Sequence, residues 1–122
     1  MKRQVLVVED EDHLRRILEL QLLDAGFAVE KASSAEEALP LIDHADLILT
    51  DFKLPGMTGL EMLQIIRRMD SHVPVIMMTA FGTPEVFEEA RRLGVFTVLD
   101  KPFDLDELDR LVERALDTPR PT

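Results

Sequence analysis

Short apolar runs alternate with longer stretches of helical periodicity along the 122 residues of this chain. Four of the runs are mostly aliphatic and β-branched and too short for isolated helices, which is typical of strands covered on both faces. These predicted strands are residues 5–8, 47–49, 75–78 and 96–99. Residues 27–31 alternate apolar and polar positions instead, a pattern that predicts an edge strand.

Apolar residues recur at helical spacing in the five stretches that follow these strands. Thr83–Pro84 and Asp104 are start signals for the fourth and fifth predicted helices. Gly26 and Gly94 follow the predicted ends of the first and fourth helices. Pro40 interrupts the second helical pattern, so it should kink that helix or weaken its first turns.

Five strands alternating with five helices predict an α/β domain of the (βα)5 type. Crossovers of this length are right-handed, so we expect a parallel five-stranded sheet between two layers of helices. We expect the domain to span residues 1–118, and residues 119–122 to form a tail or the start of a linker.

Net charge, cysteine content and the length of the apolar runs exclude several classes of function. The chain has 24 Asp and Glu against 14 Lys and Arg, a formal net charge of -10, which argues against binding nucleic acid or an anionic membrane through this domain. The absence of cysteine excludes disulfides and thiolate metal sites, and it fits a reducing compartment. No apolar run approaches the roughly 18 residues of a membrane span, and the first one is too short for a signal peptide. We therefore expect a soluble, cytoplasmic domain.

Polar side chains follow the predicted strands at the point where each strand ends. Glu9 and Asp10 follow the first, Asp51 the third, Thr79–Ala80 the fourth and Lys101 the fifth. Because the carboxyl ends of parallel strands meet at one edge, we expect these groups to converge there. Crowded carboxylates repel one another unless a cation neutralises them, and Mg²⁺ prefers a few carboxylates, waters and a phosphate oxygen. The acidic turn after the first strand argues against a flavin or nucleotide phosphate, which needs a glycine-rich turn.

These residues resemble the receiver domain of two-component response regulators. The resemblance rests on Glu9–Asp10, Asp51, Thr79–Ala80 and Lys101–Pro102, and on residues 51–59 (DFKLPGMTG), which are similar to the family's D-x-x-L-P-x-M-x-G loop. It covers residues 4 to about 117, and four motifs in order at the ends of four strands are specific where any one would be weak. It implies a flavodoxin-like, doubly wound sheet with strand order 2-1-3-4-5.

The resemblance also implies a phosphoacceptor and a metal site. Asp51 would take a phosphoryl group from the phosphohistidine of a sensor histidine kinase or phosphotransfer protein. Asp10, Asp51 and the backbone carbonyl of Lys53 would hold Mg²⁺, with Glu9 assisting directly or through water. The domain would not be an enzyme with a separate substrate, but a phosphoacceptor that assists its own phosphorylation and dephosphorylation.

Three further residues would bind the transferred group by the same resemblance. Lys101 would pair with a phosphoryl oxygen, and the peptide that joins it to Pro102 is often cis in such domains. The Thr79 hydroxyl would donate a hydrogen bond to the phosphoryl group, and the backbone N–H of Ala80 would assist it. These roles position the group and offset its charge, which is most of what phosphoryl transfer requires.

The resemblance places the output on the surface of the fourth helix, the fifth strand and the fifth helix, including Phe87 and Arg91–Arg92. Phosphorylation would reposition the fourth helix and so control an output domain or effector protein; a phosphorylation-dependent homodimer is compatible with this scheme. Val98 departs from the family, which usually carries an aromatic switch residue there. We expect Phe96, placed on the same strand face, to substitute in part.

Two other functions stay open. A degenerate receiver would keep the fold as a phosphorylation-independent protein-interaction module; the presence of Asp51, Thr79 and Lys101 argues against it, whereas Val98 leaves it open. A phosphatase similar to the haloacid dehalogenases would also form an aspartyl phosphate. That chemistry requires an acid two residues after the nucleophile, where Lys53 stands, and a cap domain for which the chain leaves no room.

Several polar residues have an ordinary interpretation instead. An acidic run is usually a solvated helix start, and we assign that role to Glu11 and Asp12. His13, His44 and His72 fall on predicted helix or loop surfaces, where we expect them to face solvent rather than bind a metal.

Overall fold

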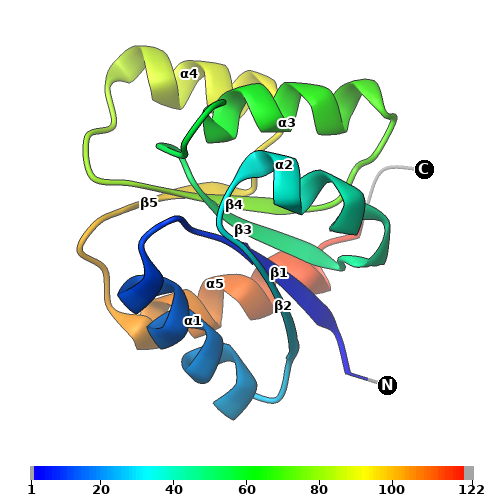
Figure 1. Ribbon diagram of the computed structural model, residues 1–122, viewed down its shortest axis with the longest axis vertical. Coiled ribbons are helices and arrows are strands. Elements are labelled where there is room, and N and C mark those ends of the chain that lie inside the picture. The colour runs from blue at the N-terminus through cyan, green and yellow to red at the C-terminus, as the bar shows by residue number, and fades with distance from the viewer. Residues whose placement is uncertain (1, 120–122) are drawn as a thin grey trace.

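The sheet has five parallel strands in the order β2-β1-β3-β4-β5, in a computed structural model that describes residues 2–119. Helices α2, α3 and α4 cover one face of the sheet, and α1 and α5 cover the other (Figure 1). The predicted flavodoxin-like (βα)5 fold and its strand order are therefore confirmed. The elements are β1 (Gln4–Val8), α1 (Asp12–Asp24), β2 (Ala28–Ala32), α2 (Ala35–Ala38), the 3-10 helix η1 (Leu39–His44), β3 (Leu47–Asp51), α3 (Gly59–Arg68), β4 (Val75–Thr79), α4 (Pro84–Arg92), β5 (Thr97–Asp100) and α5 (Leu105–Asp117).

The register of the sheet brings the carboxyl ends of its central strands together. Val8 of β1 pairs with Thr50 of β3, Asp51 pairs with Met78 of β4, and Thr79 pairs with Asp100 of β5. The residues just after each strand therefore lie at one edge of the sheet, next to the point where the strand order reverses between β1 and β3.

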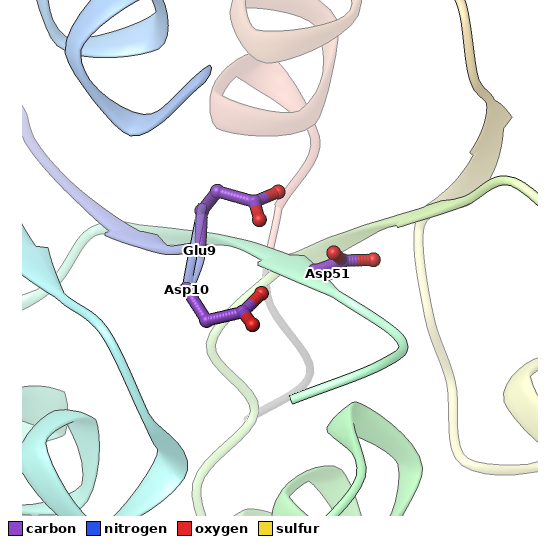
Figure 2. A group of neighbouring side chains, drawn as sticks. All are labelled: Glu9, Asp10 and Asp51. Carbon is purple, nitrogen blue, oxygen red and sulfur yellow. The ribbon is translucent and has the colours of Figure 1, made fainter. Parts of the chain in front are cut away.

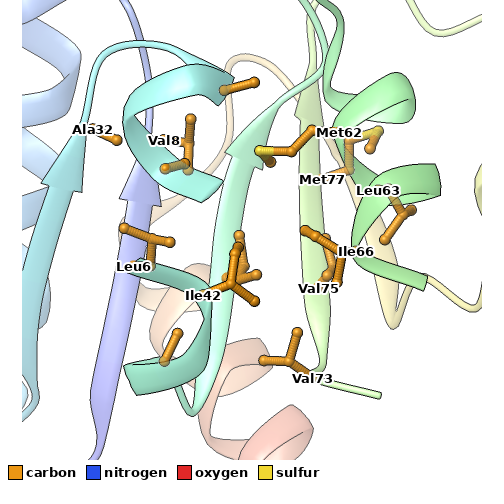
Figure 3. Packing of buried hydrophobic residues seen from close by; sticks show 14 of the residues in the cluster. Leu6, Val8, Ala32, Ile42, Met62, Leu63, Ile66, Val73, Val75 and Met77 are labelled. Carbon is orange, nitrogen blue, oxygen red and sulfur yellow. The ribbon is translucent and has the colours of Figure 1, made fainter. Parts of the chain in front are cut away.

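Side chains of the strands alternate between two cores because successive residues of a strand point to opposite faces. Leu6 and Met77 pack under α2 and α3 (Figure 3), in the same cluster as Ile48, whereas Leu49 and Ile76 pack against α1 and α5. Both faces are covered, which explains why residues 5–8, 47–49 and 75–78 of these strands are apolar at successive positions instead of at alternate ones.

Pro40 ends the second helix after a single turn. α2 stops at Ala38, and the chain continues as the 3-10 helix η1. Proline has no N–H to donate back along an α-helix and its ring crowds the preceding turn, so the predicted weakening takes the form of a change of helix type. The start signal at Thr83–Pro84 is confirmed, because Thr83 Oγ1 accepts the backbone N–H of Val86 at 3.2 Å.

The expected place of Phe96 is wrong. β5 begins at Thr97, and the Phe96 side chain packs on the α1 and α5 side of the sheet while Val98 packs on the α2 and α3 side. The β alternation does not extend back to Phe96 because this residue lies before the strand, where the chain turns out of α4 through Gly94 at φ 76°. Phe96 cannot substitute for an aromatic ring at position 98.

The boundary of the domain, expected after residue 118, stays a prediction. α5 ends at Asp117, and the predicted tail 119–122 lies, apart from Pro119, outside the described residues, as does Met1. Within residues 2–119, no helix is both long and apolar enough to cross a membrane.

Candidate functional site

A cavity of about 530 Å³ opens at the carboxyl edge of the sheet. All the residues expected to form the site contribute to its wall, and they come from the ends of β1, β3, β4 and β5. They are Glu9, Asp10, Asp51, Lys53, Thr79, Ala80 and Lys101. The predicted convergence of these residues is thus observed, whereas their chemical roles stay predictions.

Lys101 joins two buried carboxylates at the floor of the cavity. Its Nζ lies 3.0 Å from Glu9 Oε1 and 2.9 Å from Asp51 Oδ2. The exposed fractions of these side chains are 20% for Lys101, 1% for Glu9 and 9% for Asp51. Charges so far from water require a partner, and the single ammonium serves both carboxylates.

Burial and pairing compete in setting the proton affinity of these groups. Burial raises the pKa of Glu9, and this effect outweighs the opposing hydrogen bonds from the Glu11 N–H and from Lys101. Burial alone would lower the pKa of Lys101, but the hydrogen bonds to Asp51 and Glu9 outweigh it, so the pKa is raised. Lys101 is therefore held firmly in its charged form.

Glu9 and Asp10 are positioned by the loop that follows β1. The Glu9 N–H donates to Ala32 O at 3.0 Å, which extends the pairing with β2 by one residue. Glu9 Oε2 accepts the Glu11 N–H at 3.1 Å. Glu11 is the N-cap of α1, accepting the N–H groups of His13 and Leu14, as expected for the solvated half of the acidic run.

Arg15 is a positioning residue that sequence reasoning missed. Its Nη1 donates to the backbone carbonyl of Glu9 at 2.9 Å, and its Nη2 pairs with Asp12 Oδ1 at 2.6 Å. Arg15 therefore ties the first turn of α1 to the acidic loop. The signal was present in the three-residue spacing between Asp12 and Arg15, which places the two side chains side by side on a helix.

Three carboxylates can share one cation. One oxygen each of Glu9, Asp10 and Asp51, the acid triad, lies within 4.8 Å of the others, and Figure 2 shows the three side chains at the ends of β1 and β3. An all-oxygen, anionic donor set is what Mg²⁺ prefers. Lys53, the fourth expected ligand, donates its N–H to Asp51 Oδ1 over 3.4 Å and lines the same cavity.

The loop after β3 approaches Asp51 closely because two positions are glycine. A Cβ on Gly59 would lie 2.4 Å from the backbone oxygen of Asp51, so only glycine fits there. Gly56 has φ 82°, a conformation that other residues rarely adopt. Thr58 then starts α3 with a reciprocal capping box to Glu61. The loop is thereby held against the base of the cavity.

Thr79 and Lys101 are joined at the opposite wall. Thr79 is 2% exposed, and its Oγ1 accepts the Phe81 N–H at 3.2 Å. The Lys101 N–H donates to Thr79 O at 2.8 Å. The Lys101–Pro102 peptide is cis, as the resemblance implied. The three histidines expected at the surface, His13, His44 and His72, are exposed and lie outside this cavity.

Known proteins share both the sequence pattern and the fold. The model of the response regulator receiver domain family matches residues 5–113. Regulatory protein AtoC of Escherichia coli (strain K12) is 41% identical over 115 residues, which are 93% of this chain and 25% of that protein. Sporulation initiation phosphotransferase F of Bacillus subtilis (strain 168) is 34% identical over 118 residues, 95% of each chain.

Solved structures agree with the sequence matches. The non-phosphorylated HemR receiver domain from Leptospira biflexa superposes with a TM-score of 0.92 at 28% identity and covers 99% of each chain. The chain thus spans about a quarter of AtoC and nearly the whole of the HemR receiver domain.

Proposed function

Because the chain belongs to the response regulator receiver domain family, we propose that it accepts a phosphoryl group on Asp51 and converts this charge into a change of its α4–β5–α5 surface. The observation that carries the proposal is the position of Asp51. Its carboxylate is 9% exposed, faces a cavity with two further carboxylates, and accepts a hydrogen bond from Lys101 at 2.9 Å.

The donor would be a phosphohistidine of a sensor histidine kinase or phosphotransfer protein. A carboxylate oxygen of Asp51 attacks phosphorus, and the new P–O bond forms as the P–N bond to the donor imidazole breaks. The bonding electrons leave with the imidazole, which takes up a proton. Asp51 Oδ2 is engaged by Lys101, whereas within residues 2–119 Oδ1 has only the long 3.4 Å contact with the Lys53 N–H, so Oδ1 is the more available nucleophile.

The residues around Asp51 would offset the charge of the incoming group. Glu9, Asp10, Asp51 and the backbone carbonyl of Lys53 would hold Mg²⁺, which supplies positive charge against the phosphoryl oxygens when bound. Lys101 stays protonated because its pKa is raised, so it can pair with a phosphoryl oxygen while it still contacts Glu9. The domain would act on its own phosphorylation and dephosphorylation and on no other substrate.

Thr79 and Ala80 would receive the phosphoryl group on the far side of the cavity. Thr79 and Ala80 line the cavity wall, and the Thr79 hydroxyl and the Ala80 N–H would donate hydrogen bonds to an anion that carries close to two negative charges. The α4–β5–α5 surface includes Phe87, with 37% of its surface exposed, and Arg91 and Arg92, whose side chains are 73% and 67% exposed. An output domain or effector protein would bind this surface, and the negative charge of the chain argues against nucleic acid as its direct partner.

Intact-protein mass spectrometry tests the acceptor and the metal together. The wild-type chain, Asp51→Asn and a metal-free sample are incubated with acetyl phosphate, the first two with Mg²⁺. We expect one added phosphoryl group in the wild type with Mg²⁺, and none in either control. An unmodified wild-type protein that is still folded would overturn the proposal and favour the phosphorylation-independent interaction module.

A further inference from the structure

The ring of Phe87, in the first turns of α4, fills the space that Gly82 leaves open beside Thr79. A Cβ built on Gly82 would lie 2.5 Å from Phe87 Cζ, 2.8 Å from Phe87 Cε2 and 3.1 Å from Thr79 Cγ2. The ring tip and the threonine methyl therefore face the same point beside Gly82, and Phe87 Cζ and Thr79 Cγ2 lie at most about 5.6 Å apart, the sum of their distances of 2.5 Å and 3.1 Å from that point. An aromatic side chain of α4 thus reaches the wall of the proposed phosphoryl site.

Gly82 is not required by its backbone conformation. Its φ lies outside the positive range that favours glycine, since only Gly26, Gly56 and Gly94 have positive φ among the described glycines. Any other residue at position 82 would place its Cβ into the ring of Phe87. The absence of a side chain at this position is therefore what allows the ring to occupy the space that the Thr79 methyl also faces.

Thr79 cannot move independently of its surroundings. The residue is 2% exposed, and its methyl and hydroxyl share one Cβ, so a rotation or shift that brings the hydroxyl to a new acceptor also moves the methyl. Protein interiors are close-packed, and a displaced methyl must displace whatever faces it. On the side of Gly82, the facing group is the ring of Phe87.

The opposite end of α4 is fixed to α3. Arg67 donates from Nε to Leu93 O at 2.8 Å and from Nη2 to Gly94 O at 3.2 Å, and its Nη1 donates to Val73 O at 2.9 Å. One guanidinium thus holds the residues that follow α4 against the end of α3, which lies beside α4 on the same face of the sheet (Figure 1). A displacement at Phe87 would therefore move the amino-terminal end of α4 relative to a fixed carboxyl end.

We propose that Phe87 is the positioning residue through which Thr79 is coupled to α4, with its ring seated on Gly82. This inference rests on the proposed function, because it assigns the path by which a phosphoryl group on Asp51 reaches the output surface. It needs no aromatic residue at position 98, where the chain has Val98.

Two variants break this contact from opposite sides. Phe87→Leu removes the ring but keeps an apolar residue of good helix propensity. Gly82→Ala keeps the ring and displaces it with a new Cβ. Phe81→Leu is the matched control, since it makes the same substitution one residue before Gly82 in a side chain that is 84% exposed.

Each protein is treated with acetyl phosphate and Mg²⁺, and the added mass and the backbone amide NMR spectrum are recorded before and after. We expect all four proteins to gain one phosphoryl group. In the wild type and in Phe81→Leu, amide signals of residues 84–92 should shift on phosphorylation. In Phe87→Leu and Gly82→Ala these shifts should be lost, while the shifts of residues next to Asp51 remain.

The outcomes separate this inference from the proposed function. Phosphorylated Phe87→Leu and Gly82→Ala proteins whose α4 signals shift as in the wild type would overturn the coupling and leave the phosphoacceptor role standing. An equal loss in Phe81→Leu would overturn it too, since the ring of Phe87 would then not be special. A wild-type protein that gains no mass would overturn the proposed function, and the coupling with it. A purely structural role of Phe87 would lower stability without abolishing the α4 response, so thermal unfolding is recorded alongside.

Discussion

Replacing Lys101 with methionine should destabilise the folded protein strongly. Methionine has a similar length and apolar stem, so the change removes the ammonium with little loss of packing. It leaves the carboxylates of Glu9 and Asp51, which are 1% and 9% exposed, without the hydrogen bonds of 3.0 and 2.9 Å that they now receive from one cation. Both charges would then be desolvated and would repel each other.

The size of the effect follows from burial. Removing one partner of a buried ion pair costs about 3–5 kcal/mol. The Lys101 side chain is 20% exposed and the cavity is open to solvent, so water screens part of the repulsion and we expect about 2–3 kcal/mol near neutral pH. For a domain of this size, such a loss lowers Tm by roughly 8–12 °C.

The stability that Lys101→Met loses relative to the wild type should become smaller as the pH falls. Burial already raises the pKa of Glu9, and loss of Lys101 raises it further. A folded-state pKa above the unfolded value of about 4.3 means that the folded state binds more protons between the two values. The variant therefore recovers stability relative to the wild type as pH falls through the folded-state pKa of Glu9, and the deficit shrinks in acid.

The wild type should lose stability at alkaline pH. The pKa of Lys101 is raised above the ordinary lysine value of about 10.4. Its contribution to stability is therefore complete below that value and is lost as pH rises through the folded-state pKa.

Urea denaturation in metal-free buffer at about pH 7.5 and about pH 5 measures the stability lost by Lys101→Met and its recovery in acid. Wild-type midpoints followed above about pH 10.4 check the alkaline loss. Lys53→Met is the matched control, because Lys53 is an exposed lysine of the same cavity and its loss should change stability by less than about 0.5 kcal/mol. Adding Glu9→Gln to Lys101→Met should recover part of the loss. A Lys101→Met protein as stable as the wild type at neutral pH, or one with the same deficit at both pH values, would refute the electrostatic argument.

Three other predictions follow from the structure. Mg²⁺ at 100 times its Kd should stabilise the wild type by about 2.7 kcal/mol in thermal unfolding; Asp10→Asn should reduce this gain without destabilising the metal-free protein, whereas Asp12→Asn should keep it, and an equal gain in both variants would remove Asp10 from the site. Thr58→Ala should cost about 1 kcal/mol in urea, because it removes the N-cap of α3; an unchanged midpoint would contradict this. Gln21→Leu should cost about 1–3 kcal/mol, because Asp109 Oδ2 loses its 2.7 Å hydrogen bond and Oδ1 already has no partner among the described residues; adding Asp109→Leu should recover most of the loss, and a larger loss in the double variant would argue against it.

The site could be predicted from the sequence because topology alone brings its residues together. Asp51 and Lys101 lie 50 positions apart, yet Asp51 is the last residue of β3 and Lys101 directly follows β5, at the same edge of a parallel sheet. Once strands and crossovers are recognised from periodicity, the right-handed βαβ connection leaves few arrangements. The alternation of buried residues on both faces follows from the same geometry.

What the sequence did not reveal depends on local geometry and on contacts between side chains. Phe96 was placed on the wrong face because the strand boundary, one residue away, decides which way a side chain points. The role of Arg15 does not follow from the sequence, since its hydrogen bond to the Glu9 carbonyl exists only once the acidic loop has folded. The placement of Phe87 and Thr79 around the same space beside Gly82 depends on how α4 lies on the sheet, which periodicity does not specify.

The balance of charge in the cavity connects the acceptor to the switch. The acid triad carries three negative charges and Lys101 returns one, so the site holds a surplus of two, which matches one divalent cation. On the proposed mechanism, phosphorylation replaces the single charge of Asp51 with close to two, and the new surplus appears on oxygens that lie farther into the cavity. Lys101 is already shared between two carboxylates, and the donors expected at the end of β4 are the Thr79 hydroxyl and the Ala80 N–H, since both residues line the cavity. Hydrogen bonds from Thr79 and Ala80 to these oxygens would draw in the end of β4, so the response should begin at Thr79 and reach α4 through Phe87, whose ring occupies the space beside Gly82.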